Sequence, residues 1–164
     1  MTTSVAVFDQ LNLFACLNPE QRALVQPLFV FRDYVDEAVI FEQGDAAEYL
    51  YVVAEGGVHI LYKPDDGPEI TIARVRPEGV AGWSAVLGTP SYTSTAVCEG
   101  KTRLLRVHGA DLRTLCERHP ETGRLVIEQL ADVIAERLQG THAQVLALLE
   151  QGMRLGAKKT VAID

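Results

Sequence analysis

Residues 49–63 read YLYVVAEGGVHILYK, and this stretch decides the class of fold. Valine, isoleucine and tyrosine are frequent in it, and the pair Gly56-Gly57 interrupts it. β-Branched and aromatic residues favour strands, whereas paired glycines are typical of turns. The stretch therefore predicts two short strands with a break at Glu55-Gly56-Gly57.

Similar β-rich runs lie on both sides of this stretch. They are VFRDY (30–34), AVIFEQG (38–44), ITIARVRPEG (70–79), TSTAVCEG (93–100) and TRLLRVHG (102–109). Further breaks fall at Gly44-Asp45 and at Asp65-Asp66-Gly67-Pro68. Short strands at regular spacing with glycine turns favour an antiparallel sandwich or jelly roll.

Helical patterns precede and follow the β-rich part. Residues 8–29 show an apolar period of 3.6, and Asn18-Pro19 is typical of an N-cap followed by proline at the first helical position. Residues 110–120 predict a short helix that ends before Pro120. A long helix then continues to about residue 155, and Gly140 weakens it by about 1 kcal/mol relative to alanine.

These patterns predict a fold that is mainly β with flanking helices. We divide the chain into an N-terminal helical segment (1–29), a β-roll (30–109), two C-terminal helices (110–155) and a tail (156–164). The last helix carries an apolar stripe, which we interpret as the seam of a homodimer because one β-roll does not fully cover it. Its expected interface residues are Leu130, Val133, Ile134, Leu138, Val145 and Leu149. The alternative is a monomer in which the stripe packs only on its own roll.

Composition excludes several classes of function. The 164 residues are 48% hydrophobic and 23% charged, as expected for one soluble globular domain. No apolar run is long enough for a membrane helix, and the first residues do not form a signal peptide. The net charge is −7 without a clustered basic patch, so we expect no direct DNA binding. Three widely spaced cysteines indicate free thiols and a cytoplasmic protein.

The order of elements and three stretches resemble the cyclic-nucleotide-binding domain family, which includes the catabolite activator protein and related bacterial regulators. The stretches are VIFEQGDAAEYLYVVAEGGVHILY (39–62), GVAGWSAVLGTPSYTSTAVCEGKTRLLRV (79–107) and CERHPETGRLVIEQLADVIAERLQGTHAQVLALL (116–149). The resemblance implies a double-stranded β-helix with N-terminal helices and a long C-terminal helix. It also places the family's phosphate-binding cassette at 79–98.

This cassette departs from the family pattern at both of its charged positions. The family has a glutamate directly after the glycine, for the ribose, where this chain has Trp83 after Gly82. It has an arginine, for the cyclic phosphate, at the position that falls here on Tyr92. The resemblance also places two contacts from the last helix, on Thr141 and His142. The candidate pocket therefore comprises Gly82, Trp83, Ser84, Ala85, Tyr92, Thr93, Ser94, Thr141 and His142.

Three interpretations of the cassette stay open. Trp83 and Tyr92 either fill and close the old pocket, or rebuild it for an unusual small ligand, or leave room for a true cyclic nucleotide. In the last case neutral hydroxyls and backbone N–H groups around 82–86 replace the arginine, at a cost in affinity. The DNA-reading members of the family continue into a helix-turn-helix, whereas this chain ends soon after its last helix. We therefore expect a stand-alone regulatory domain, with a protein partner as a further candidate function.

The other candidate sites are weaker. Cys116 and His119 have a C-x-x-H spacing, but a zinc site needs about four ligands and no second pair is evident. Some regulators of this fold hold haem, and His142 is the one residue that suggests it here; we expect neither metal nor cofactor. The sequence contains no nucleophile elbow, Walker loop or paired carboxylates, so we do not expect an enzyme.

Overall fold

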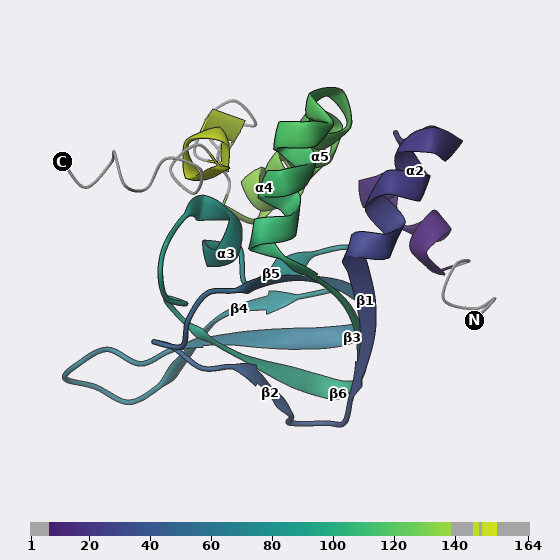
Figure 1. Cartoon of the computed structure of the whole chain (residues 1–164). Helices are drawn as coiled ribbons and strands as arrows, with labels where there is room; N and C mark the ends of the chain where they lie inside the picture. Colours follow the sequence, from purple (N-terminus) through teal and green to yellow (C-terminus); the bar gives the residue numbers. More distant parts are fainter. Residues whose placement is uncertain (1–6, 139–145, 148, 154–164) are drawn as a thin grey trace, which may run out of the picture.

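The computed structural model describes residues 7–138, 146–147 and 149–153 of the chain. Six strands form one antiparallel sheet that closes into a roll, with the order β1-β6-β3-β4; β2 pairs with β6, and β5 pairs with β3. Figure 1 shows the helices on one side of these strands. The predicted mainly-β roll with flanking helices is therefore confirmed. The strands are β1 (Phe29–Tyr34), β2 (Val39–Phe41), β3 (Tyr49–Tyr62), β4 (Ile70–Val75), β5 (Val80–Ala81) and β6 (Thr95–His108).

The two longest strands are longer than the sequence predicted. The break expected at Glu55-Gly56-Gly57 is wrong, because β3 runs through it with two shifts of register against β6. The two strands expected at 93–100 and 102–109 are likewise one, because β6 runs from Thr95 to His108. Gly56 has a φ of +86°, and a Cβ there would lie 2.4 Å from the carbonyl oxygen of Lys101. The glycines therefore form a β-bulge between two long strands. They do not form a turn that ends a strand.

The helices follow the capping signals of the sequence. The N-terminal part contains η1 (Asn12–Phe14), α2 (Pro19–Val25) and η2 (Gln26–Leu28). The oxygen of the Asn18 side chain accepts from the backbone N–H of Gln21, so the predicted cap and first-turn proline are confirmed. The later helices are α3 (Ser84–Leu87), α4 (Gly109–Arg118) and α5 (Pro120–Leu138). α4 ends before Pro120 as predicted; residues 146–147 and 149–153 are again helical.

The sheet separates two hydrophobic cores. The first core lies between the outer face of the roll and the helices, and includes Leu50, Leu105 and Leu130. The second core fills the interior of the roll, and includes Phe41, Leu104 and Tyr92. Because alternate residues of a strand point to opposite faces, neighbours such as Leu104 and Leu105 belong to different cores.

Candidate functional site

Gly82 brings the candidate segment 82–96 against strand β3. Its φ is +77°, a backbone conformation that glycine adopts without strain. A Cβ at this position would lie 2.8 Å from the carbonyl oxygen of Tyr49 and 3.3 Å from the rings of Phe41 and Tyr51. The single turn α3 then follows, and Gly88 ends it in the left-handed conformation. The glycine is therefore required for the close approach of the segment to the sheet.

Tyr92 is buried in the interior of the roll. Only 5% of it is exposed, and its ring stacks on Phe41 with centroids 3.8 Å apart. Its hydroxyl donates to the carbonyl oxygen of Tyr49 at 2.6 Å and accepts from the backbone N–H of Tyr49 at 3.0 Å. Burial raises the pKa of this phenol, so it is neutral at physiological pH. At the position where the resemblance leads us to expect the family's arginine, the chain therefore places a neutral ring with its polar atom already bonded.

Trp83 and Tyr92 lie on opposite faces of the sheet. Trp83 is half-buried and packs against the first core, beside the helices, whereas Tyr92 belongs to the second core. From the sequence we expected Trp83 and Tyr92 to line one pocket, because both stand at positions where the family motif has charged residues. The structure separates them, so they do not form two walls of one cavity.

The donors expected from the loop are only partly available. The backbone N–H groups of Ala85 and Val86 donate within the turn, to the carbonyl oxygens of Gly82 and Trp83. Ala85 is buried, Ser84 and Ser94 are half-buried, and Thr93 is exposed. Two of the backbone donors that the sequence suggested for an anion at residues 82–86 are therefore used within the turn itself.

The C-terminal end of α3 contacts the last described helical residues. A Cβ on Gly152 would lie 2.5 Å from the carbonyl carbon of Leu87 and 2.6 Å from the carbonyl oxygen of Val86. A Cβ on Gly88 would lie 3.2 Å from the carbonyl oxygen of Gly152. Backbone therefore packs on backbone here, which couples the position of α3 to that of residues 149–153. Thr141 and His142, the expected contacts from the last helix, lie outside the described residues.

The expected dimer seam is largely covered within one chain. Leu130, Ile134 and Leu149 are at most 1% exposed and belong to the first core. Val133 is half-buried and packs against that core. Val145 lies outside the described residues, as does the side chain of Leu138. Of the six residues predicted for the interface, Val133 is therefore the described one with surface left for a partner.

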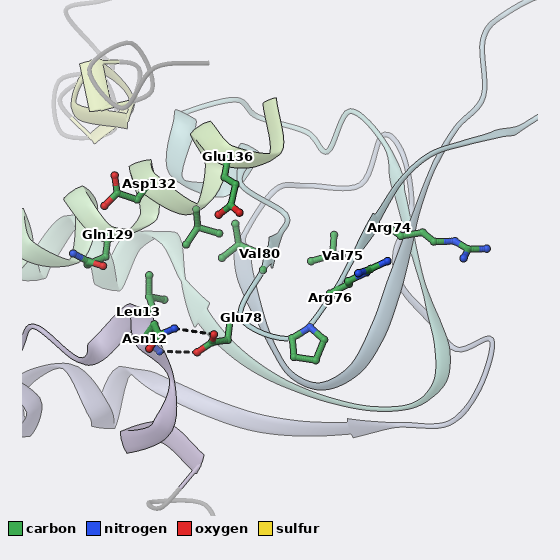
Figure 2. A pocket seen from close by; sticks show the side chains of 13 residues that line it. Asn12, Leu13, Arg74, Val75, Arg76, Glu78, Val80, Gln129, Asp132 and Glu136 are labelled. Atoms are coloured by element: carbon green, nitrogen blue, oxygen red, sulfur yellow. Dashed lines mark hydrogen bonds between the residues drawn. The ribbon is translucent and has the colours of Figure 1, made fainter. Parts of the chain in front are cut away.

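None of four surface cavities includes a residue of the segment 82–96. The largest, about 550 Å³, lies between η1, the β4–β5 turn and α5 (Figure 2). Glu78 stands on its wall with a φ of +75°. Both of its carboxylate oxygens accept from Asn12, at 2.8 and 2.9 Å. This contact fixes the turn that leads into β5 and the candidate segment.

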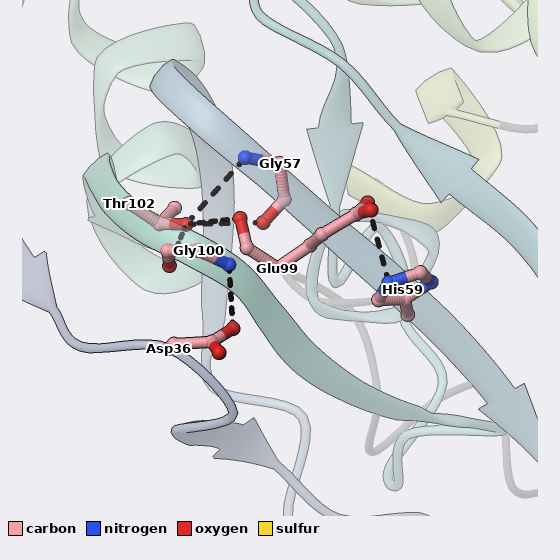
Figure 3. A network of polar contacts seen from close by, with 6 residues as sticks. All are labelled: Asp36, Gly57, His59, Glu99, Gly100 and Thr102. Atoms are coloured by element: carbon pink, nitrogen blue, oxygen red, sulfur yellow. Dashed lines mark hydrogen bonds and ion pairs between the residues drawn. The ribbon is translucent and has the colours of Figure 1, made fainter.

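A polar network holds the bulge in the middle of the two long strands β3 and β6 (Figure 3). Thr102 Oγ1 lies 3.1 Å from the carbonyl oxygens of both Gly57 and Gly100, and Asp36 accepts from the N–H of Gly100 at 2.7 Å. His59 and Glu99 pair across the strands at 3.2 Å. Every buried side-chain donor or acceptor among the described residues has a partner, so the network is structural.

The sequence pattern missed the residues that surround Tyr92. Phe41 and Tyr51 join it in the second core, and Tyr49 bonds its hydroxyl. Arg106 packs on the ring of Tyr49, with its Cζ 4.3 Å from the centroid. The alternation of β3 and β6 places the side chains of Tyr49, Tyr51 and Arg106 on one face, but only the register of the two strands brings them together.

The fold and the glycine-bounded segment define a cyclic-nucleotide-binding β-roll. The chain belongs to the cyclic nucleotide-binding domain family, whose model matches residues 31–119. It is 34% identical over 127 residues to the cyclic AMP receptor protein of Thermus thermophilus, covering 77% of this chain and 57% of that protein. It is also 34% identical over 115 residues to a candidate potassium channel protein of Rhodopseudomonas palustris, covering 70% of this chain and 27% of that one.

A solved structure gives the same fold over its whole length. This is a candidate cyclic nucleotide-binding protein from Geobacter metallireducens, 25% identical, with a TM-score of 0.70. The alignment covers 84% of this chain and 98% of that chain. The chain thus spans nearly all of this relative, but between a quarter and three fifths of the two curated relatives.

Other kinds of site are not evident in the part of the chain that is described. Its histidine, cysteine and acidic side chains form no group of three that could hold a metal ion. Cys116 is half-buried, and burial raises the pKa of its thiol. None of the helices described, taken singly, combines the length and the apolar composition needed to cross a membrane.

Proposed function

We propose that this chain is the sensory domain of a regulatory protein and that it binds a small ligand by a route that differs from the family's arginine. The observation that carries the proposal is the buried Tyr92 at the arginine position. A side chain that bonds Tyr49 with its only polar atom offers no donor to a phosphate. Ligand binding therefore depends on other residues of the roll.

The proposal extends to a change of shape. The contact of Gly88 with Gly152 links α3 to the C-terminal helical residues. A ligand that moves the segment 82–96 therefore moves this contact, provided that it binds the two positions with different affinity. We further propose a homodimer that uses the exposed side of α5, through Val133 and the polar residues beside it.

Specific observations also support two other functions. True cyclic nucleotide binding is supported by the family membership and by the kept Gly82. A protein-interaction module is supported by Tyr92 filling the interior, since a closed pocket leaves only the surface for function. Thermal unfolding in the presence of ligands distinguishes both functions from the first proposal.

The first test is thermal unfolding with about 1 mM cyclic AMP or cyclic GMP. A ligand at 100 times its dissociation constant adds about 2.7 kcal/mol, or about 5–10 °C for a domain of this size. We expect a smaller shift, because a charge-assisted bond to the cassette is missing. A full shift supports the true cyclic nucleotide sensor instead. No shift with any small ligand supports the interaction module.

A variant that restores the charged residues of the family's cassette provides a comparison with the unaltered chain. The variant Trp83→Glu/Tyr92→Arg returns both charged residues of the family pattern, and we expect it to gain affinity for cyclic AMP of at least tenfold. Thr93→Arg adds the same charge one residue later, at an exposed position, and should gain nothing. Equal gains in the two variants contradict the assignment of Tyr92 to the arginine position.

A further inference from the structure

Strand β6 carries an arginine on the inner face of the roll. In the register of β3 with β6, Arg106 faces Tyr51 and Leu104 faces Val53. Because alternate residues of a strand share a face, Arg106 lies on the same face as Leu104. Leu104, Tyr51 and Tyr92 all belong to the second core. The arginine and the tyrosine of the cassette therefore lie on the same side of the sheet.

Aromatic rings hold the guanidinium of Arg106 in place. Its Cζ lies 4.3 Å from the ring centroid of Tyr49, close enough for a cation–π attraction. It also lies near the hydroxyl of Tyr51: burial raises the pKa of that phenol, and the charge and hydrogen bonding of Arg106 oppose the rise. A guanidinium has five N–H donors in a fixed plane, so these contacts leave donors for a further acceptor.

No carboxylate pairs with this cation in the part of the chain that is described. The ion pairs there involve other groups, such as Arg103 with Asp33 at 2.9 Å. A half-buried guanidinium usually faces a carboxylate or a phosphate, because a charge withdrawn from water needs compensation. The carboxylates of Glu48 and Asp45 instead act on Tyr92. Arg106 therefore has the charge, and donors to spare, for an anion from outside the described chain.

Strand β1 adds to the positive field on this face. Burial raises the pKa of the Tyr34 phenol, and the charges of both Arg106 and Arg32 oppose the rise. Arg32 is exposed and, like Arg106, takes part in no ion pair with a described residue. Two arginines and several phenols therefore surround one region of the inner face.

Resting on the proposed function, we propose that Arg106, and not a residue of the segment 82–96, binds the negative group of the ligand. The ligand class is a small oxyanion, phosphate or carboxylate, joined to a planar ring. Charge-assisted N–H···O bonds from the guanidinium hold the oxyanion, and the half-buried rings of Tyr34 and Tyr49 pack against the ligand's ring. The positive charge that the family places on a loop lies here on a strand.

Calorimetric titration of the full chain tests this assignment with four probes: cyclic AMP, cyclic GMP, benzoate and inorganic phosphate. We expect a probe with both ring and oxyanion to bind more tightly than phosphate. Arg106→Gln should then lower its affinity about 10- to 100-fold. Arg103→Gln is the matched control, because Arg103 lies on the same strand and is paired with Asp33. Tighter binding of the cyclic nucleotides identifies the oxyanion as a phosphate, and tighter binding of benzoate identifies it as a carboxylate.

A second measurement does not depend on how a variant folds. In the ¹⁵N-labelled chain, the Nε–Hε signal of Arg106 is assigned by its loss in Arg106→Lys. The signal should shift when the bound probe is added, while that of Arg103 stays in place. Unchanged affinity in Arg106→Gln, or an unshifted Arg106 signal with a bound probe, overturns this inference and leaves the proposed function standing. Failure of all four probes to bind overturns the inference, because they represent the ligand class that it names, and leaves the sensory function to the thermal-unfolding test.

Discussion

The hydroxyl of Tyr92 lies 2.6 Å from the carbonyl oxygen of Tyr49 and 3.0 Å from its amide nitrogen. One side chain of the cassette thus satisfies both backbone groups of the residue that begins β3. Because both partners are buried or half-buried, water cannot readily replace these bonds. The tyrosine therefore stabilises the roll at the position that we assign, by resemblance, to the family's ligand-binding arginine.

Removing this hydroxyl should destabilise the chain. Tyr92→Phe keeps the ring on Phe41 but leaves the backbone groups of Tyr49 without a partner, so we expect a loss of about 1–3 kcal/mol in the free energy of unfolding. Denaturant unfolding followed by circular dichroism measures it. Tyr62→Phe, at a position 40% exposed, is the control and should change little. Equal midpoints for both variants contradict the role given to the Tyr92 hydroxyl.

Alkaline pH should destabilise the fold through the buried phenols. Tyrosine in an unfolded chain ionises near pH 10. Burial raises the pKa values of Tyr51 and Tyr92, so the folded chain keeps protons that the unfolded chain loses. Their stabilising contribution is fully present below about pH 10 and is lost as the pH rises further. Tyrosinate absorbance should therefore rise together with the loss of circular dichroism, and Tyr51→Phe should make stability less dependent on pH. Full ionisation near pH 10 in a folded chain is the contrary result.

The contact between α3 and the last helical residues should be sensitive to one methyl group. In Gly152→Ala the new Cβ meets the backbone of Leu87 and Val86, which cannot rotate away. We expect a loss of about 1–3 kcal/mol, since overpacking of a tight contact forces backbone shifts. Hydrogen exchange should locate the change in residues 84–88. Gln151→Ala, exposed and adjacent, should leave exchange there unaltered.

The two sides of α5 should respond differently to substitution. Leu130 is fully buried, so Leu130→Ala should cost about 2–5 kcal/mol in stability. Val133 is half-buried, so Val133→Glu should cost less but should dissociate a dimer that forms along this helix. Sedimentation measures the mass of each variant. If the unaltered chain sediments as a monomer at all concentrations, the proposed dimer is excluded.

Local signals in the sequence predicted much of the fold. Asn18-Pro19 marked the start of α2, and Pro120 marked the end of α4, because capping and proline geometry act over a few residues. The glycine pair in β3 was misread, because a bulge and a turn need the same residue and differ only in the partner strand. Whether Gly56 turns the chain depends on its approach to Lys101, which is distant in sequence.

The candidate site was harder to predict than the fold. The departure at Trp83 and Tyr92 could be seen from the family pattern, but their placement on opposite faces of the sheet could not. Arg106 carried no signal of its own, since an arginine in a strand is ordinary. Its significance comes from the register that sets it beside Tyr51, and from its taking part in no ion pair with a described residue.

Trp83 is the sole tryptophan of the chain, and it directly precedes α3 while packing against the first core. Its indole emission therefore arises at the junction of the candidate segment and the helices. An indole changes its wavelength and intensity when its burial changes. The protein thus carries an intrinsic optical reporter at the place where occupancy of the roll is expected to reach the helices, and a ligand can be sought by fluorescence without any label.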